Sequence, residues 1–190
     1  VDAYEEGSWI KLIPEQNKIV GYNTRNSGGV GKNYANYFVV QFDRPFVDNC
    51  VWVGDNKVEG LKEIKADHVG AAVRFKTHRG EAINVTTASS FISVEQAELN
   101  LKEIGTKSFD EVKAQSKAEW NRVLGAINVE SDNVDQLRTF YSCFFRALVF
   151  PHRMHEIDAN GNVVHYSPFG EGSVAPGYFY TGTGFWDTFR

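Results

Sequence analysis

Cysteine is scarce in this sequence, with only Cys50 and Cys143 among 190 residues. The first lies in a strand-like run and the second in a segment with helical spacing. So wide a separation gives neither a disulfide framework nor the close spacing of a zinc site. We expect two buried free thiols.

Clustered positive charge and long apolar runs are also missing. The net charge is -4 and the lysines and arginines are scattered, whereas nucleic-acid binding usually needs a basic face. No stretch approaches the roughly 18 uninterrupted apolar residues of a membrane span. The sequence also lacks a nucleophile elbow, a phosphate loop, a zinc motif and a dinucleotide fingerprint. These absences argue against a nucleic-acid partner, a membrane span and several common enzyme classes.

Aromatic side chains, in contrast, are plentiful at 14% of the sequence. They suit a deep core, which is their commoner use, or a surface that stacks against flat ligands such as sugar rings. The sequence opens at Val1 without a methionine and stops at Arg190 just inside a helix-like segment. We therefore expect an excerpt of a longer protein.

The first half of the sequence has the two-residue period of β-strands, most clearly over residues 37–42. Turns rich in glycine and asparagine separate short runs. Strands are expected at 19–22, 36–42, 50–53, 71–76 and 82–90. This spacing predicts an antiparallel β-sandwich. Five strands are few for a whole sandwich, so part of it is expected before Val1.

Helical signals begin at residue 93. Two capping-box patterns, opened by Ser93 and Ser108, predict helices over 94–104 and 109–124. Each is followed by a glycine suited to end a helix. The sandwich is thus expected to lead into a helical region.

A third helix is predicted from about Asp132, whose side chain can cap free amide groups. Its apolar residues recur at helical spacing and form a wide stripe, made of Leu137, Phe140, Tyr141, Phe144, Phe145 and Leu148. Such a stripe must be covered by other helices, which are expected beyond Arg190.

Histidines and carboxylates gather after residue 150, as in a metal site. His152 and His155 would share a face only on a helix, and a proline before them and an Asn-Gly turn after them favour extended structure. We predict a solvated hairpin with strands at 154–157 and 162–166, and no metal. No chemistry is assigned to His68, His78 and His165.

Trp186 and Asp187 stand side by side where a glycine-bearing loop enters a helix-like segment. An indole can stack on the C–H face of a sugar while a carboxylate accepts hydrogen bonds from its hydroxyls. The simpler interpretation is a helix cap beside a core tryptophan. Tyr178 and Tyr180 precede the pair, and could wall a pocket or cover a rim.

The run GFWDTFR at 184–190 resembles the calcium-dependent exo-α-mannosidases of glycoside hydrolase family 92. Further segments that resemble the family lie at 37–46, 118–121, 140–141, 150–151, 165–168 and 176–178. The resemblance implies an N-terminal β-sandwich of the supersandwich type, a helical linker and an (α/α)6 barrel. The corresponding domain limits are 1–92, 93–130 and 131–190.

The resemblance also implies a function, the release of terminal mannose with inversion from α-mannosides such as N-glycans. Asp187 would hydrogen-bond hydroxyls of the terminal mannose, and Trp186 would shape that subsite. The acid, the base and most ligands of the calcium ion are expected beyond these residues, so the excerpt alone should be inactive. The family implies a periplasmic or extracellular bacterial protein.

Two other functions are weighed against this one. The sandwich could be a non-catalytic carbohydrate-binding module, in which Asp187 merely caps a helix. The chain could also come from another glycosidase or phosphorylase with an (α/α)6 barrel. The sequence fixes neither the linkage preference nor the oligomeric state.

Overall fold

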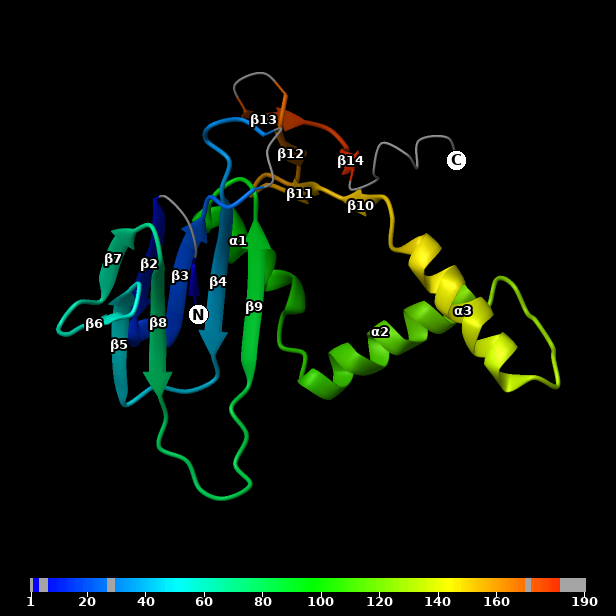
Figure 1. Ribbon diagram of the computed structural model, residues 1–190, viewed down its shortest axis with the longest axis horizontal. Helices are drawn as coiled ribbons and strands as arrows, with labels where there is room; N and C mark the ends of the chain where they lie inside the picture. The colour runs from blue at the N-terminus through cyan, green and yellow to red at the C-terminus, as the bar shows by residue number, and fades with distance from the viewer. Residues whose placement is uncertain (1, 4–6, 27–29, 170–171, 182–190) are drawn as a thin grey trace. The chain divides into compact units, whose positions relative to one another are not determined.

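The computed structural model describes residues 2–3, 7–26, 30–169 and 172–181 (Figure 1). Its elements fall into two compact units. The sandwich unit comprises residues 1–105 and 156–177, and the helical unit comprises residues 106–155 and 178–190. Each is described by itself. The predicted domain limits at residues 92 and 130 stay predictions.

Two antiparallel sheets form the β-sandwich within the sandwich unit, which confirms the predicted class. The larger has the strand order β7 (Glu63–Ala66), β2 (Ser8–Ile13), β3 (Lys18–Asn23), β4 (Asn36–Phe42), β9 (Val85–Ser90). The smaller has the order β1 (Asp2–Ala3), β8 (Val69–Arg74), β5 (Asp48–Val53), β6 (Asn56–Val58). All five predicted strands are present, and β2 is a central strand that the sequence reasoning did not separate.

The core of the sandwich lies between the two sheets. Ile10, Leu12 and Ile19 come from the larger sheet, and Val51 and Val69 from the smaller, and each is at most 2% exposed. The alternation in β4 is confirmed, because its even-numbered residues pack toward this core while the odd-numbered ones face the other way. Burial of these apolar side chains is the main force that holds the two sheets together.

Helix α1 (Val94–Leu101) covers part of the outer face of the larger sheet, where Ala97 packs with Val20 and Val39. The Ser93 hydroxyl accepts a hydrogen bond from the Gln96 amide at 3.1 Å, as its spacing predicts. A short 3-10 helix, η2 (Lys102–Ile104), continues α1. Another, η1 (Pro14–Gln16), joins β2 to β3.

The helical unit contains α2 (Phe109–Leu124) and α3 (Val134–Leu148). Ser108 and Glu111 form the complete capping box that their spacing predicts. Asp132 was the wrong cap for α3. The cap is Asn133, because the helix begins at Val134, one residue later than a cap at Asp132 requires. The Asn133 Oδ1 accepts hydrogen bonds from the amides of Asp135 at 3.0 Å and Gln136 at 3.2 Å.

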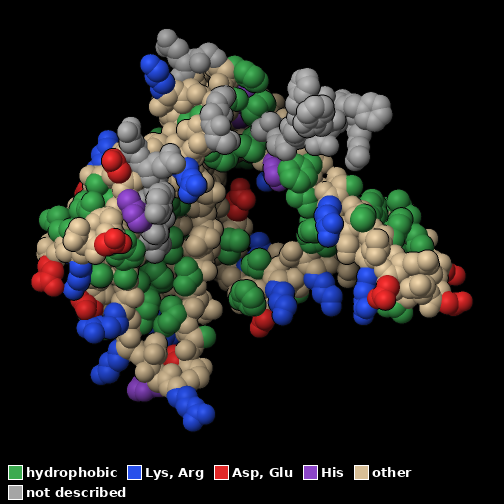
Figure 2. All heavy atoms as spheres, in the orientation of Figure 1, with side chains coloured by type: hydrophobic (Ala, Val, Ile, Leu, Met, Phe, Trp, Pro, Cys, Tyr) green, Lys and Arg blue, Asp and Glu red, His purple; other side chains and the backbone are tan. Residues whose placement is uncertain are grey.

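The stripe of α3 is not buried within its own unit. No residue of α2 or α3 is buried, and Phe145 and Leu148 are 41% and 40% exposed. Figure 2 shows hydrophobic side chains gathered over this helix. Cys143 on α3 is also exposed, so the expectation of two buried thiols was wrong, although both cysteines are free.

Five short strands, β10 to β14, complete the described chain. In the helical unit, β10 (His152–Arg153) pairs with β14 (Tyr180–Thr181). A second small sheet has the order β11 (His155–Ile157), β12 (Val163–Ser167), β13 (Ser173–Pro176). The hairpin from β11 to β12 confirms the predicted one. Its turn is fixed by Asp158, whose Oδ1 accepts from the amides of Asn160 and Asn162, both at 2.8 Å.

Candidate functional site

The predicted sugar-contacting pair, Trp186 and Asp187, lies outside the described residues, which end at Thr181. The strands that lead toward it are described. In β10 and β14, His152 pairs with Thr181 and Arg153 with Tyr180. The approach to the predicted site is therefore a paired strand, where the sequence reasoning expected a loop at Tyr180.

An imidazole anchors this approach. The ring of His155 makes edge contacts with Tyr178 and Tyr180, at centroid distances of 4.8 and 5.1 Å. Its Nδ1 lies 3.3 Å from the carbonyl oxygen of Phe179. His155 is only 9% exposed, whereas Tyr178 and Tyr180 are 71% and 55% exposed. The hairpin edge is thus not fully solvated as predicted, and the buried histidine holds two exposed tyrosines in place.

Glu156 follows at once and binds elements of the sandwich unit. Its Oε1 accepts from the Ser90 hydroxyl at 3.0 Å and the Phe91 amide at 3.1 Å. Its Oε2 accepts from Asn100 Nδ2 at 2.6 Å. Nearby, Gln96 Nε2 donates to the Ile157 carbonyl at 2.7 Å. Through these contacts the Glu156 carboxylate joins β11 to α1 and to the end of β9.

Within the described ranges, no group of three or more His, Cys, Asp and Glu side chains is arranged to hold a metal ion. His152 is exposed while His155 is buried against tyrosines. His165 Nδ1 lies 2.9 Å from the Gly177 carbonyl oxygen. His155 in β11 and His165 in β12 thus each have a local contact that accounts for the position of the ring.

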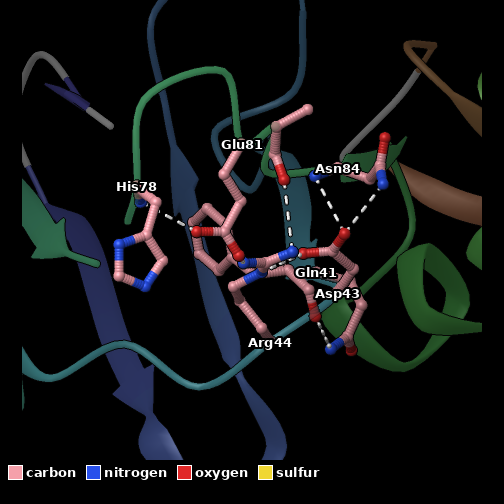
Figure 3. A network of polar contacts seen from close by, with 8 residues as sticks. Gln41, Asp43, Arg44, His78, Glu81 and Asn84 are labelled. Carbon is pink, nitrogen blue, oxygen red and sulfur yellow. Dashed lines mark hydrogen bonds and ion pairs between the residues drawn. The ribbon is translucent and has the colours of Figure 1, made fainter. Parts of the chain in front are cut away.

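A second polar cluster ties the segment before β9 to the turn after β4 (Figure 3). Asp43 accepts from the amide of Asn84 at 3.1 Å and from its side chain at 2.8 Å, and these bonds lower the pKa of the aspartate. Glu81 accepts from the His78 amide and pairs with Arg44, which lowers the pKa of the glutamate. All of these partners belong to two loops, so the cluster shapes the loops.

One outer face of the larger sheet carries a row of aromatic rings. Trp9, Tyr22 and Tyr37 lie directly opposite one another across β2, β3 and β4. Trp9 and Tyr22 are stacked at 5.7 Å, and Tyr22 meets Tyr37 edge-on at 5.6 Å. Burial, the neighbouring Tyr22 and Glu95 raise the pKa of Tyr37. The sequence reasoning missed this row, because it requires the register of three strands at once.

This aromatic row lines an open groove of about 480 Å³ beside the start of α1. The other lining residues are Lys65, Ser93, Val94 and Glu95. Such a volume lies within the range of small-ligand sites, roughly 300–1,000 Å³. The groove belongs wholly to the sandwich unit.

The described residues thus form a β-sandwich unit and a helical unit. The model for the glycosyl hydrolase family 92 N-terminal domain matches residues 2–90, and the model for the catalytic domain of that family matches residues 96–190. The chain therefore belongs to glycosyl hydrolase family 92. No curated protein sequence matches it significantly.

Solved structures agree with the family models. The chain is 41% identical to a family GH92 inverting mannosidase from Bacteroides thetaiotaomicron VPI-5482, with a TM-score of 0.93 over 100% of this chain and 26% of that one. A GH92 alpha-mannosidase from Bacteroides thetaiotaomicron is 24% identical, with a TM-score of 0.80 over 98% of this chain and 25% of that one. The same enzyme in complex with mannoimidazole gives 24% identity and a TM-score of 0.76, covering 98% and 24%.

The chain thus spans about a quarter of the length of these structures. The two matches at 24% identity show the fold alone. They support the fold, a β-sandwich followed by helices, while the match of residues 96–190 to the family's catalytic domain comes from the family model.

Proposed function

We propose that the protein to which this chain belongs is an exo-acting α-mannosidase that hydrolyses terminal α-mannosides with inversion. The observation that carries the proposal is the 41% identity to an inverting GH92 mannosidase over the whole of this chain. The match of residues 96–190 to the family's catalytic domain supports it, because the GFWDTFR run lies inside that match.

In this proposal Asp187 accepts hydrogen bonds from hydroxyls of the terminal mannose, and Trp186 shapes the same subsite. Charge-assisted hydrogen bonds of this kind fix the orientation of a sugar ring. The support from the described chain is the paired strand β14, which ends a few residues before Trp186, and the buried His155 that holds Tyr180. Together these contacts would orient the backbone that enters the subsite.

Inversion needs a carboxylic acid that protonates the leaving oxygen and a carboxylate that activates water on the opposite face. In inverting enzymes the two groups stand about 6.5–9.5 Å apart. We place both in the part of the protein beyond this chain. Because we place both groups outside this chain, we expect the 190-residue chain alone not to hydrolyse mannosides.

A calcium requirement and a periplasmic or extracellular location are part of the proposal. Calcium prefers six to eight oxygen ligands, and the described residues contain no cluster of acidic side chains that fits. We assign no step to the ion within this chain. No helix among the described residues is long and apolar enough to cross a membrane.

The test uses the complete protein. Release of mannose is measured from an aryl α-mannoside and from α-mannobiose, with and without a calcium chelator. Asp187→Ala should lower kcat/KM at least about 100-fold, since it removes charge-assisted bonds to the sugar. Asp67→Ala, on an exposed aspartate of the sandwich unit, serves as the control and should leave kcat/KM unchanged.

No release from any α-mannoside would overturn the proposed activity. Full activity in the Asp187→Ala variant would overturn the assigned subsite while leaving the activity standing. Activity that persists in the chelator would remove calcium from the proposal.

A further inference from the structure

The aromatic row of the sandwich unit forms a stepped platform along the groove. The rings of Trp9 and Tyr22 are inclined by only 29°, whereas the ring of Tyr37 stands at 64° to that of Tyr22. Trp9, Tyr22 and Tyr37 occupy one register level on three adjacent strands. Neighbouring strands lie about 4.8 Å apart, so the three rings extend over roughly 10 Å. All three side chains are half-buried, which keeps the rings fixed while part of each faces the groove.

The edge of the groove is polar and carries both charges. Lys65 lies opposite Trp9 in the register of β7 and β2, and Glu95 lies at the start of α1. Both are exposed. One ammonium and one carboxylate provide donors and an acceptor without a net charge, so the groove has no preference for an anionic or a cationic ligand.

The polar edge of the Trp9 indole is hydrogen-bonded within the protein. Its indole Nε1 donates to Glu63 Oε1 at 3.0 Å, and Glu63 is paired with Lys11 at 2.9 Å. These two bonds lower the pKa of Glu63, which remains ionised as an acceptor. The polar edge of the indole is therefore satisfied by protein, and its apolar face remains for packing.

We propose that this groove is a carbohydrate-binding site that holds pyranose units of an α-mannan chain. A pyranose presents an apolar face of C–H groups that packs on aromatic rings, and its hydroxyls donate and accept at the edge. A platform of about 10 Å accommodates two successive sugar rings. A fully apolar ligand would make no polar contact with Lys65 or Glu95, and a charged ligand would be repelled by whichever of the two carries the same charge.

The identity of the sugar rests on the proposed function, whereas the presence of a sugar site rests on the groove. Occupation of the groove would retain a polymeric substrate on the enzyme between successive cleavages. The expected consequence is a lower KM for α-mannan than the catalytic subsite alone would give, with no effect on small aryl mannosides.

Affinity electrophoresis of the complete protein in gels that contain α-mannan tests the site. The Asp187→Ala background slows hydrolysis and removes the predicted contact in the catalytic subsite, so retardation in that background reports binding elsewhere. Trp9→Ala should raise the dissociation constant for mannan at least about fivefold, because it removes the largest ring of the platform. Lys65→Ala should raise it by a smaller factor. Phe109→Ala removes a ring that is 73% exposed in the helical unit, and should change nothing.

The two proposals fail in different ways. If otherwise native protein with Trp9→Ala cleaves the aryl mannoside normally and its Asp187→Ala counterpart is retarded by mannan as before, the groove proposal is wrong and the mannosidase proposal stands. If Trp9→Ala lowers the melting temperature, the Lys65→Ala variant is used in its place, because Lys65 is exposed. Unchanged retardation of that variant by mannan would then overturn the proposed sugar site. Retardation by mannan without any mannosidase activity would support the sugar site and overturn the proposed enzymatic activity.

Discussion

The two units of this chain differ in how they bury their apolar residues. In the sandwich unit, seven clustered hydrophobic residues are at most 9% exposed, and both sheets contribute to the cluster. In the helical unit, α2 and α3 have apolar residues at helical spacing, yet none of them is buried. The sandwich unit therefore contains its own core, whereas the stripe of α3 is not buried within the helical unit.

The largest expected effect comes from Leu12→Ala in the sandwich core. Leu12 is 2% exposed, so the change should lower the free energy of unfolding by about 2–5 kcal/mol. Phe145→Ala in the helical unit should cost only about 1 kcal/mol, because the ring is 41% exposed and packs mainly on Trp120. Urea denaturation of the 190-residue chain measures both.

The same pair of variants in the complete protein would sharpen the contrast. If the remaining helices cover the stripe, Phe145→Ala should then cost about 3–5 kcal/mol, as buried phenylalanines do. An equal, small cost in both proteins would show that the stripe stays exposed.

A smaller effect is expected at the start of α2. Ser108→Ala removes the half of the capping box made by the Ser108 hydroxyl, which accepts from the Glu111 amide, and leaves the bond from the backbone amide of residue 108 to the Glu111 carboxylate. It should destabilise the helix by about 1 kcal/mol. Ser116 lies in the middle of the same helix and is exposed, so Ser116→Ala is the matched control and should be neutral or slightly stabilising. Amide hydrogen exchange in α2, compared with exchange in β4, would show whether the loss is confined to the helical unit. Equal losses in both segments would contradict the separation of the two units.

The smallest expected effect is on the stability of the fold at low pH. Hydrogen bonds from the Asn162 side chain and from the backbone amides of Asn162 and Asn160 lower the pKa of Asp158 below its ordinary value of 3.8. A lowered pKa in the folded state means that the stabilisation is complete above the ordinary value and is lost as the pH falls through the folded one. NMR titration should find the low pKa, and Asp158→Asn should remove that part of the acid sensitivity. A carboxyl that titrates at its ordinary value would contradict the turn geometry.

Local patterns in the sequence predicted the elements that depend on nearby residues. The alternation over residues 37–42 placed β4 correctly, because the faces of a strand are decided by a period of two. The capping box at Ser108 placed the start of α2, because the box is satisfied within one turn. At α3 the prediction missed the cap by one residue, because Asn133 has the extended backbone of an N-cap residue and the local pattern at Asp132 does not reveal it.

Long-range features could not be predicted in the same way. The burial of His155 depends on Tyr178 and Tyr180, which return to it through β14 after an intervening hairpin. The aromatic row depends on the alignment of three strands, which no single segment specifies. The predicted Trp186 and Asp187 lie outside the described residues, so their roles stay predictions.

Glu156 has a further consequence for the chain's architecture. The chain leaves the sandwich unit after Gly105 and re-enters it at Glu156. Asn100 and Glu156 are joined at 2.6 Å, so both ends of the excursion are fastened close together on the sandwich side. In polymer terms the helical segment is a closed loop, and the entropy of closing a loop grows only slowly with its length. Insertions or deletions between the two attachment points should therefore cost the sandwich little.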